Sequence, residues 1–129
     1  MVHTTCLTVR YGETDMFGHV NNAVYLSYLE EARLQFMEDL GFVVVPLILA
    51  SVKADFRAQA FFKQKLVIET AVDRIGNSSF DLVNRIKDEA AGQLIVEALV
   101  TMVHFNFDTK KSELLPGIFR EKLSQYLGK

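Results

Sequence analysis

The sequence predicts an α+β fold in which one helix packs on an antiparallel sheet of about five strands. Two observations support this prediction. Apolar residues recur at the helical period in one long segment near the start of the chain, and at a period of two in several later segments. Short turns separate the later segments, and such turns join strands into antiparallel hairpins. The 129 residues suffice for one core, so we expect a single domain over residues 1–129.

The predicted helix covers residues 23–40. Its apolar residues follow one another at spacings of four, three, four and four, which places them on one buried stripe: Tyr25, Leu29, Ala32, Phe36 and Leu40. Asn21 or Asn22 would cap its start by accepting a backbone N–H, and Gly41 would end it in the left-handed conformation. Ahead of the helix we expect an extended segment over residues 5–13 and then a loop.

Four long strands are predicted after the helix. Apolar and polar residues alternate in the first of these strands, so one of its faces is expected to be exposed to solvent. The turns "GNSS" and "AAG" between later strands have the small and polar residues typical of hairpins. The last strand is apolar on both faces, which suits a central position in the sheet. These strands are expected over residues 48–60, 65–75, 80–89 and 93–107.

A short helix is expected to close the chain within residues 115–127. It would carry four apolar residues on one side: Ile118, Phe119, Leu123 and Leu127. His104 lies in the strand that is apolar on both faces, so we expect a core histidine with satisfied ring nitrogens. Cys6 is expected to be a core residue of the first extended segment.

Composition excludes several classes of protein. The net charge of −2 argues against a general affinity for nucleic acid or for anionic membranes. The single cysteine excludes an internal disulfide and, by itself, a structural zinc site. We find neither the basic start and apolar run of a signal peptide nor an apolar stretch long enough to span a membrane. These features predict a soluble cytoplasmic protein.

The apolar content predicts a partner subunit. Half of the residues are hydrophobic, which is generous for a small domain. One helix covers only one face of the sheet, and several positions on the other face are apolar or small. We therefore expect a homodimer or a homotetramer.

The segment "TDMFGHVNNAVYLSYLEEAR", residues 14–33, resembles the loop and helix of hotdog-fold acyl-CoA thioesterases of the 4-hydroxybenzoyl-CoA thioesterase type. The matching residues are Asp15, Gly18, His19, Val20, Asn21, Asn22, Tyr25, Glu30, Ala32 and Arg33. The order of helix and strands extends the likeness over nearly the whole chain. The resemblance implies a hotdog fold, with a five-stranded antiparallel sheet wrapped around one long helix. One departure is "QAFFKQ", which has Gln59, Lys63 and Gln64 where the family usually has Pro, Gly and Asp.

The resemblance also implies the reaction, hydrolysis of a thioester to a free carboxylic acid. Asp15 would either attack the thioester carbonyl as a nucleophile or activate a water as a general base. This carboxylate would be an effective nucleophile or base because of its position and because Phe17 and a partner subunit desolvate it. The positive end of the helix would stabilise the oxyanion, with the backbone amide of Asn22 as donor. His19 would hold the loop, orient Asp15 or contact the substrate, and we expect neither a metal nor a cofactor.

The substrate would be an acyl-CoA or an acyl-carrier-protein thioester. Phe17 and Tyr25 would line the acyl pocket, while Arg57 and Lys63 belong to a basic run that would bind phosphates of coenzyme A. Glu30 and Arg33 lie three apart on the helix and would either pair or face a partner subunit. Two other functions share the fold: a hotdog dehydratase or hydratase, and a non-catalytic acyl-binding module.

Overall fold

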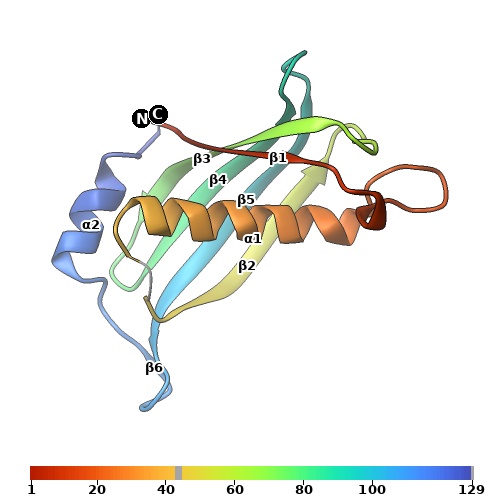
Figure 1. Cartoon of the computed structure of the whole chain (residues 1–129). Coiled ribbons are helices and arrows are strands. Elements are labelled where there is room, and N and C mark those ends of the chain that lie inside the picture. Colours follow the sequence, from red (N-terminus) through yellow and green to blue (C-terminus); the bar gives the residue numbers. More distant parts are fainter. Residues whose placement is uncertain (43–44, 129) are drawn as a thin grey trace.

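The computed structural model describes residues 1–42 and 45–128, and it shows one helix lying across one face of a curved sheet (Figure 1). The elements in chain order are β1 (His3–Thr8), a 3₁₀ turn (Tyr11–Glu13), α1 (Asn22–Asp39), β2 (Leu47–Phe56), β3 (Lys65–Ile75), β4 (Ser79–Asp88), β5 (Leu94–Asn106), β6 (Lys111–Ser112) and α2 (Gly117–Ser124). The α+β class and the order of its long elements are therefore confirmed.

The strands are antiparallel and lie side by side in the order β1-β3-β4-β5-β2, with β6 added beside β5. The expected five strands are present, and β6 adds a two-residue sixth. The predicted turns join β3 to β4 and β4 to β5, and Gly92 in the second turn has a φ of +73°. β2 forms one edge of the sheet, and it pairs with β5 along its other side.

Helix α1 has 18 residues and buries the stripe that its periodicity predicts. All five predicted core residues are at most 6 % exposed: Tyr25, Leu29, Ala32, Phe36 and Leu40. Gly41 follows with a φ of +91°, the left-handed conformation expected at a helix end. The helix packs these residues against the alternating inner residues of the sheet, among which Leu66, Ile68, Leu82 and Ile86 are at most 1 % exposed. The core thus lies between α1 and the sheet.

Several expectations about local structure are wrong. The extended segment ends at Thr8, because Arg10 and Glu13 form a capping box around a 3₁₀ turn. Cys6 is exposed, since the alternation of β1 turns it to the side opposite His3 and Leu7. β2 ends at Phe56, and a bulge between Leu49 and Ser51 interrupts its alternation.

The closing helix is shorter than its pattern suggests. α2 ends at Ser124, so Leu127 lies beyond it and is 42 % exposed, and Ile118 is 62 % exposed. Phe119 and Leu123 are fully buried, which leaves a narrow contact with the core. His104 is 9 % exposed and its Nδ1 donates to the carbonyl oxygen of Leu114 at 2.9 Å, which confirms its burial and the satisfaction of one ring nitrogen. Among the described residues, no helix combines the length and hydropathy needed to cross a membrane.

Candidate functional site

The loop ahead of α1 is folded around the side chain of Asp15. Its Oδ1 accepts the backbone N–H of Phe17 at 2.9 Å and that of His19 at 3.2 Å. The backbone N–H of Asp15 donates to the carbonyl of His19 at 2.7 Å, and Gly18 has a φ of +80° that permits the tight turn. The loop therefore orients the carboxylate through one oxygen, and no hydrogen bond within the described chain uses Oδ2.

The start of α1 leaves one backbone amide free. Asn21 is the N-cap, and its side-chain oxygen accepts the N–H of Ala23 at 2.9 Å. The carbonyl of Asn21 accepts the N–H of Val24 at 2.8 Å. In the described part of the chain, the N–H of Asn22 has no partner, and the first turn of α1 contains no acidic residue. A donor at the positive end of the helix thus stays available for an external acceptor.

One cavity of about 330 Å³ brings these groups together. Its walls are formed by Asp15, His19, Val20, Asn21, Asn22 and Gln59. The three residues that the resemblance marks as catalytic therefore lie around a single space, the carboxylate beside the helix start. Val20 is the one apolar residue in the wall, so the cavity suits a polar reacting group better than an acyl chain.

Gln59 is a member of the cavity that the sequence analysis does not identify as a site residue. It lies beyond the end of β2, and the backbone of the next residue, Ala60, accepts the N–H of Val20 at 2.9 Å. That bond brings a distant segment to the loop. The sequence signal is only indirect: a polar residue between Ala58 and Ala60, at a place where the family usually has proline.

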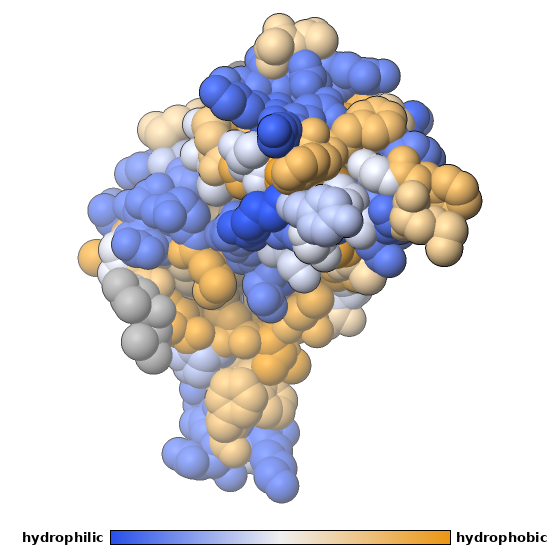
Figure 2. All heavy atoms as spheres, turned by 45° about the vertical axis from the view of Figure 1, so that its right-hand side comes forward, coloured by the Kyte–Doolittle hydropathy of each residue, from blue (hydrophilic) through white to orange (hydrophobic). Residues whose placement is uncertain are grey.

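Phe17 and Lys63 do not line this cavity within the described chain. Phe17 is 75 % exposed and Met16 is 90 % exposed, so the loop presents apolar side chains to the outside instead of covering Asp15. Figure 2 looks onto this end of the molecule and shows such apolar surface next to hydrophilic residues. The ammonium of Lys63 lies 5.4 Å from the centre of the Phe62 ring. The expected desolvation of Asp15 by Phe17 is therefore absent in the single chain.

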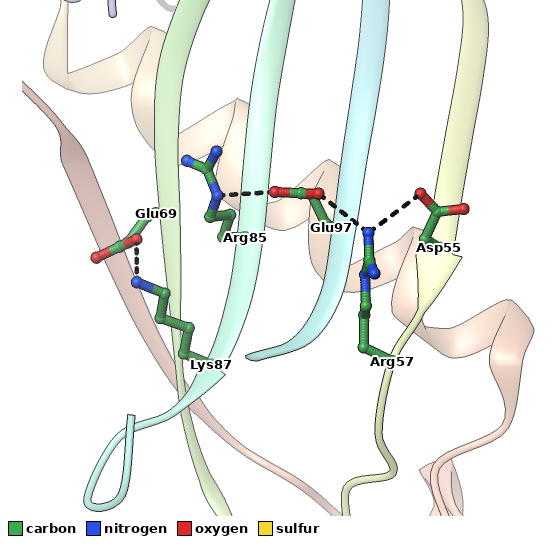
Figure 3. A network of polar contacts seen from close by, with 6 residues as sticks. All are labelled: Asp55, Arg57, Glu69, Arg85, Lys87 and Glu97. Atoms are coloured by element: carbon green, nitrogen blue, oxygen red, sulfur yellow. Dashed lines mark hydrogen bonds and ion pairs between the residues drawn. The ribbon is translucent and has the colours of Figure 1, made fainter. Parts of the chain in front are cut away.

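Arg57 lies on the face of the sheet opposite α1, in a row of ion pairs (Figure 3). Its guanidinium is 3.5 Å from Glu97 and 3.8 Å from Asp55, and Glu97 also pairs with Arg85 at 2.9 Å. Arg57 is thus neutralised by carboxylates and does not line the Asp15 cavity. The expected contact of Arg57 with a phosphate would require its ion pairs with Asp55 and Glu97 to break.

Comparisons with known proteins agree with this geometry. The thioesterase-like superfamily matches residues 9–123 of the chain. This chain belongs to the thioesterase-like superfamily. The long-chain acyl-CoA thioesterase FadM of Escherichia coli is 33 % identical over 132 residues, which cover 94 % of this chain and 96 % of FadM.

Two solved structures support the same assignment. A predicted thioesterase from Bacillus stearothermophilus has a TM-score of 0.90 at 28 % identity, over 100 % of this chain and 98 % of that one. The probable thioesterase YbaW from Escherichia coli has a TM-score of 0.79 at 30 % identity, over 97 % and 98 % of the two chains. The hotdog fold and the thioester-hydrolase class expected from the loop motif are confirmed.

In this member of the thioesterase-like superfamily, Tyr25 belongs to the core and not to a cavity wall. It is 1 % exposed, and its hydroxyl accepts the N–H of Ala60 at 2.9 Å. Ala60 in turn accepts the N–H of Val20. Tyr25 therefore connects the helix to the segment that is hydrogen-bonded to the end of the Asp15 loop.

We expect Tyr25→Phe to destabilise the protein by about 1–3 kcal/mol, because the buried N–H of Ala60 loses its acceptor. Urea unfolding followed by circular dichroism measures the change. Tyr11→Phe is the matched control, since Tyr11 is 76 % exposed. Equal losses in both variants would contradict the connecting role of Tyr25.

Glu13, two residues before Asp15, accepts hydrogen bonds through both of its carboxylate oxygens. Its Oε1 accepts the backbone N–H of Arg10 and the hydroxyl of Tyr28, each at 2.8 Å, and the guanidinium of Arg10 donates to Oε2. Burial alone would raise the pKa of Glu13, but these hydrogen bonds outweigh it and hold the pKa below its usual value. Glu13 therefore anchors the loop.

We expect Glu13→Gln to lower the stability by about 1 kcal/mol at neutral pH, a modest value because the ion pair with Arg10 is partly exposed. Since the folded-state pKa is depressed, the stabilisation is present above the unfolded pKa and is lost as the pH falls through the folded one. The difference in unfolding free energy between parent and variant should therefore disappear in acid, below about pH 4. Urea midpoints across this range measure it, and a gap that widened in acid would contradict the assignment.

The second half of α1 borders another cavity, of about 240 Å³. It lies between α1 and the start of β2, and its walls are Glu30, Arg33, Leu34, Met37, Phe42, Val45, Leu47, Leu49 and Met102. Asn22 and Arg33 are eleven residues apart, or about 16 Å along the helix axis. The buried residues Tyr25, Leu29 and Ala32 fill the core between them. Within one chain, the polar and the apolar cavity are therefore separate.

No group of three or more His, Cys, Asp or Glu side chains gathers to hold a metal ion in residues 1–42 and 45–128. The arrangement offers instead a carboxylate, a free amide donor and an imidazole around one space. These groups can polarise a carbonyl and deliver a nucleophile to it.

Proposed function

We propose that this chain hydrolyses acyl-CoA thioesters to a free carboxylic acid and coenzyme A. The observation that supports this most is the shared cavity of the Asp15 carboxylate and the free N–H of Asn22. Thioester hydrolysis needs both a group that delivers the nucleophile and a donor for the oxyanion. The long-chain acyl-CoA thioesterase FadM, to which the chain is 33 % identical, supports the substrate class. An acyl-carrier-protein thioester would undergo the same chemistry.

In the proposed reaction, the thioester carbonyl oxygen accepts the N–H of Asn22 at the positive end of α1. The Oδ1 of Asp15 accepts the two N–H groups that hold the loop, so Oδ2 is available to take a proton or to attack the carbonyl carbon. As a base it takes a proton from water, and the hydroxide adds to the carbonyl carbon. As a nucleophile it forms an anhydride that water then cleaves. In either case the C–S bond breaks, and the sulfur leaves with the electron pair and is then protonated. His19, which lies beside Asp15, helps to orient the reacting groups.

The protein is proposed to work as a homodimer or homotetramer. A long acyl chain needs apolar walls, whereas the cavity around Asp15 has polar walls apart from Val20. A second copy would supply the missing apolar surface and would cover the exposed Phe17. We assign the reaction to the cytoplasm, where a lone exposed cysteine such as Cys6 stays reduced.

Steady-state assays with a panel of short, long and aromatic acyl-CoA substrates, read out by release of the free thiol, test the proposal. The parent is expected to hydrolyse at least one class, and Asp15→Asn is expected to lose that turnover. Absence of turnover by the parent on every substrate, with binding of acyl-CoA intact, would point instead to a non-catalytic acyl-binding module. Equal turnover by both proteins would remove Asp15 from the mechanism.

A further inference from the structure

Gln59 belongs to a segment that pairs antiparallel with the end of the loop ahead of α1. His19 and Phe61 form an antiparallel bridge, with their ring centres 4.9 Å apart. In antiparallel pairing, each step forward along one segment matches a step back along the other, so Gln59 lies opposite Asn21. Asn21 is the N-cap of α1. This register brings a residue from beyond the end of β2 next to the helix start.

The side chain of Gln59 lies on the same side of these two segments as that of His19. Val20 and Ala60, which alternate with these residues, are both buried in the core. Side chains alternate between the two sides of an extended segment, and residues directly opposite each other share a side. Gln59 is exposed and therefore faces away from the core, where it forms part of the wall of the Asp15 cavity.

Asp15 and Gln59 reach the cavity from opposite edges of the segment between them. On one edge, the N–H of Asp15 donates to the carbonyl of His19 at 2.7 Å. On the other edge, the N–H of Val20 donates to the carbonyl of Ala60 at 2.9 Å. The carbonyl of His19 and the N–H of Val20 belong to one peptide unit, in which these groups point in opposite directions. The carboxylate and the carboxamide therefore flank the segment that leads to the helix start.

The carboxamide of Gln59 is free, whereas the backbone beside it is fixed. Ala60 donates its N–H to the hydroxyl of Tyr25, and Phe61 donates its N–H to Oε1 of Gln64, each at 2.9 Å. In residues 1–42 and 45–128, no hydrogen bond uses the side chain of Gln59. A glutamine amide carries two N–H donors, and here both are available to an acceptor in the cavity.

Thioester hydrolysis has a use for a second donor at this place. Addition to the thioester puts negative charge on the carbonyl oxygen, and preorganised N–H groups stabilise that oxyanion. The helix start contributes the N–H of Asn22. The next two N–H groups, those of Ala23 and Val24, are bonded to Asn21. Gln59 lies opposite Asn21, so its N–H groups come from the neighbouring segment to the same end of the helix.

We propose that the carboxamide of Gln59 is the second donor to the oxyanion, an inference that rests on the proposed function. Its Nε2 and the N–H of Asn22 both donate to the carbonyl oxygen while the nucleophile adds from the Asp15 side. When the C=O bond re-forms, the C–S bond breaks and the sulfur takes the electron pair, and the amide keeps its protons throughout. The family usually has proline at this position, and proline has no donor, so the contact is a feature of this chain.

Two substitutions of Gln59 test the donor. Gln59→Met keeps the length of the side chain and removes its polar groups, whereas Gln59→Glu keeps an acceptor oxygen and removes the N–H donors at neutral pH. Each is expected to lower kcat about 10²-fold on the best acyl-CoA substrate and to change KM by no more than about threefold, because the bond strengthens in the transition state. Gln93→Met is the matched control, since Gln93 is an exposed glutamine just before β5.

A measurement without turnover tests the contact itself. In an Asp15→Asn background, lauroyl-CoA labelled with heavy carbon at the thioester carbonyl is bound, and its carbonyl stretching band is recorded by infrared difference spectroscopy. Hydrogen bonds to the carbonyl oxygen move this band to lower wavenumber. We expect a smaller displacement when Gln59→Met is added to the background, and an unchanged displacement when Gln93→Met is added.

Parent-like kcat in Gln59→Met, with its fold verified by circular dichroism, would overturn the proposal. A raised KM at unchanged kcat would also overturn it, since Gln59 would then contact a part of the substrate away from the reacting carbonyl. Parent-like activity of Gln59→Glu would mean that the side chain acts as an acceptor.

The infrared band separates this proposal from the proposed function. A parent that hydrolyses no thioester, but whose bound carbonyl band depends on Gln59, would contradict the proposed function and leave the donor in place. A band that is the same with and without the carboxamide would remove Gln59 from the oxyanion site, even if the parent is an active thioesterase.

Discussion

Asp15→Asn is expected to lower kcat/KM for the best acyl-CoA substrate by about 10³-fold, the middle of the range for loss of a positioned acid–base group. Asparagine retains the side-chain oxygen that accepts the N–H groups of Phe17 and His19, so the loop should keep its shape. The substitution removes the negative charge and the basicity alone. Thiol-release kinetics measure the loss, and urea unfolding verifies that stability changes by less than about 1 kcal/mol.

Glu31→Gln is the matched control, because it removes an exposed carboxylate on helix α1 that does not line the cavity. A loss as large in the control, or turnover in Asp15→Asn within a few-fold of the parent, would contradict the role of Asp15. A single turnover in water enriched in heavy oxygen distinguishes the two mechanisms. Label in the Asp15 side chain identifies the nucleophilic route, because water then cleaves the anhydride at the carbonyl carbon of Asp15, whereas a general base leaves label only in the released acid.

Asn22→Pro is expected to lower kcat by about 10²–10³-fold, the effect of removing one oxyanion donor. Proline lacks the backbone N–H, and Asn22 is the first residue of α1, the position where helices accept proline best. The preceding residue, Asn21, has φ −63° and ψ 136°, which is the conformation that a following proline requires. The helix and its cap should therefore persist while the donor is lost.

Asn22→Ala is the control for this experiment, because it removes the side chain and keeps the N–H. We expect it to retain kcat within a few-fold, and we expect similar unfolding midpoints for both variants. A large loss in Asn22→Ala would mean that the side-chain amide, and not the backbone, contacts the substrate. Parent-like activity of a folded Asn22→Pro would remove the helix start from the mechanism.

Much of the fold could be predicted because its long elements have regular periods. The helix was expected at residues 23–40 and lies at Asn22–Asp39, and β3 was expected at residues 65–75, where it lies. Short elements have no period to detect. The two-residue β6 arises only because β5 extends far enough to pair with it, and the 3₁₀ turn depends on the bonds between Arg10 and Glu13.

The loop motif places Asp15, His19 and Asn22 near one another because they are close in sequence and precede one helix. The segment carrying Gln59 reaches the same cavity through the bond between Val20 and Ala60, 40 residues apart in the chain, which no local pattern reports. Phe17 and Arg57 fail to reach it for the same kind of reason. Phe17 projects from the loop into solvent, and Arg57, just after β2, pairs with Asp55 of β2 and Glu97 of β5.

The sequence by itself determined the class of fold, the capped helix and the position of Asp15 just ahead of that helix, since these depend on residues within a few positions of each other. Only the tertiary structure decided that Tyr25 is a core residue joined to Ala60, and that Arg33 is buried beside an apolar cavity. The physical reason is that periodicity states which residues share a side of a helix. Strands that are distant in the chain decide which residues pack against that side and which buried polar groups are hydrogen-bonded there.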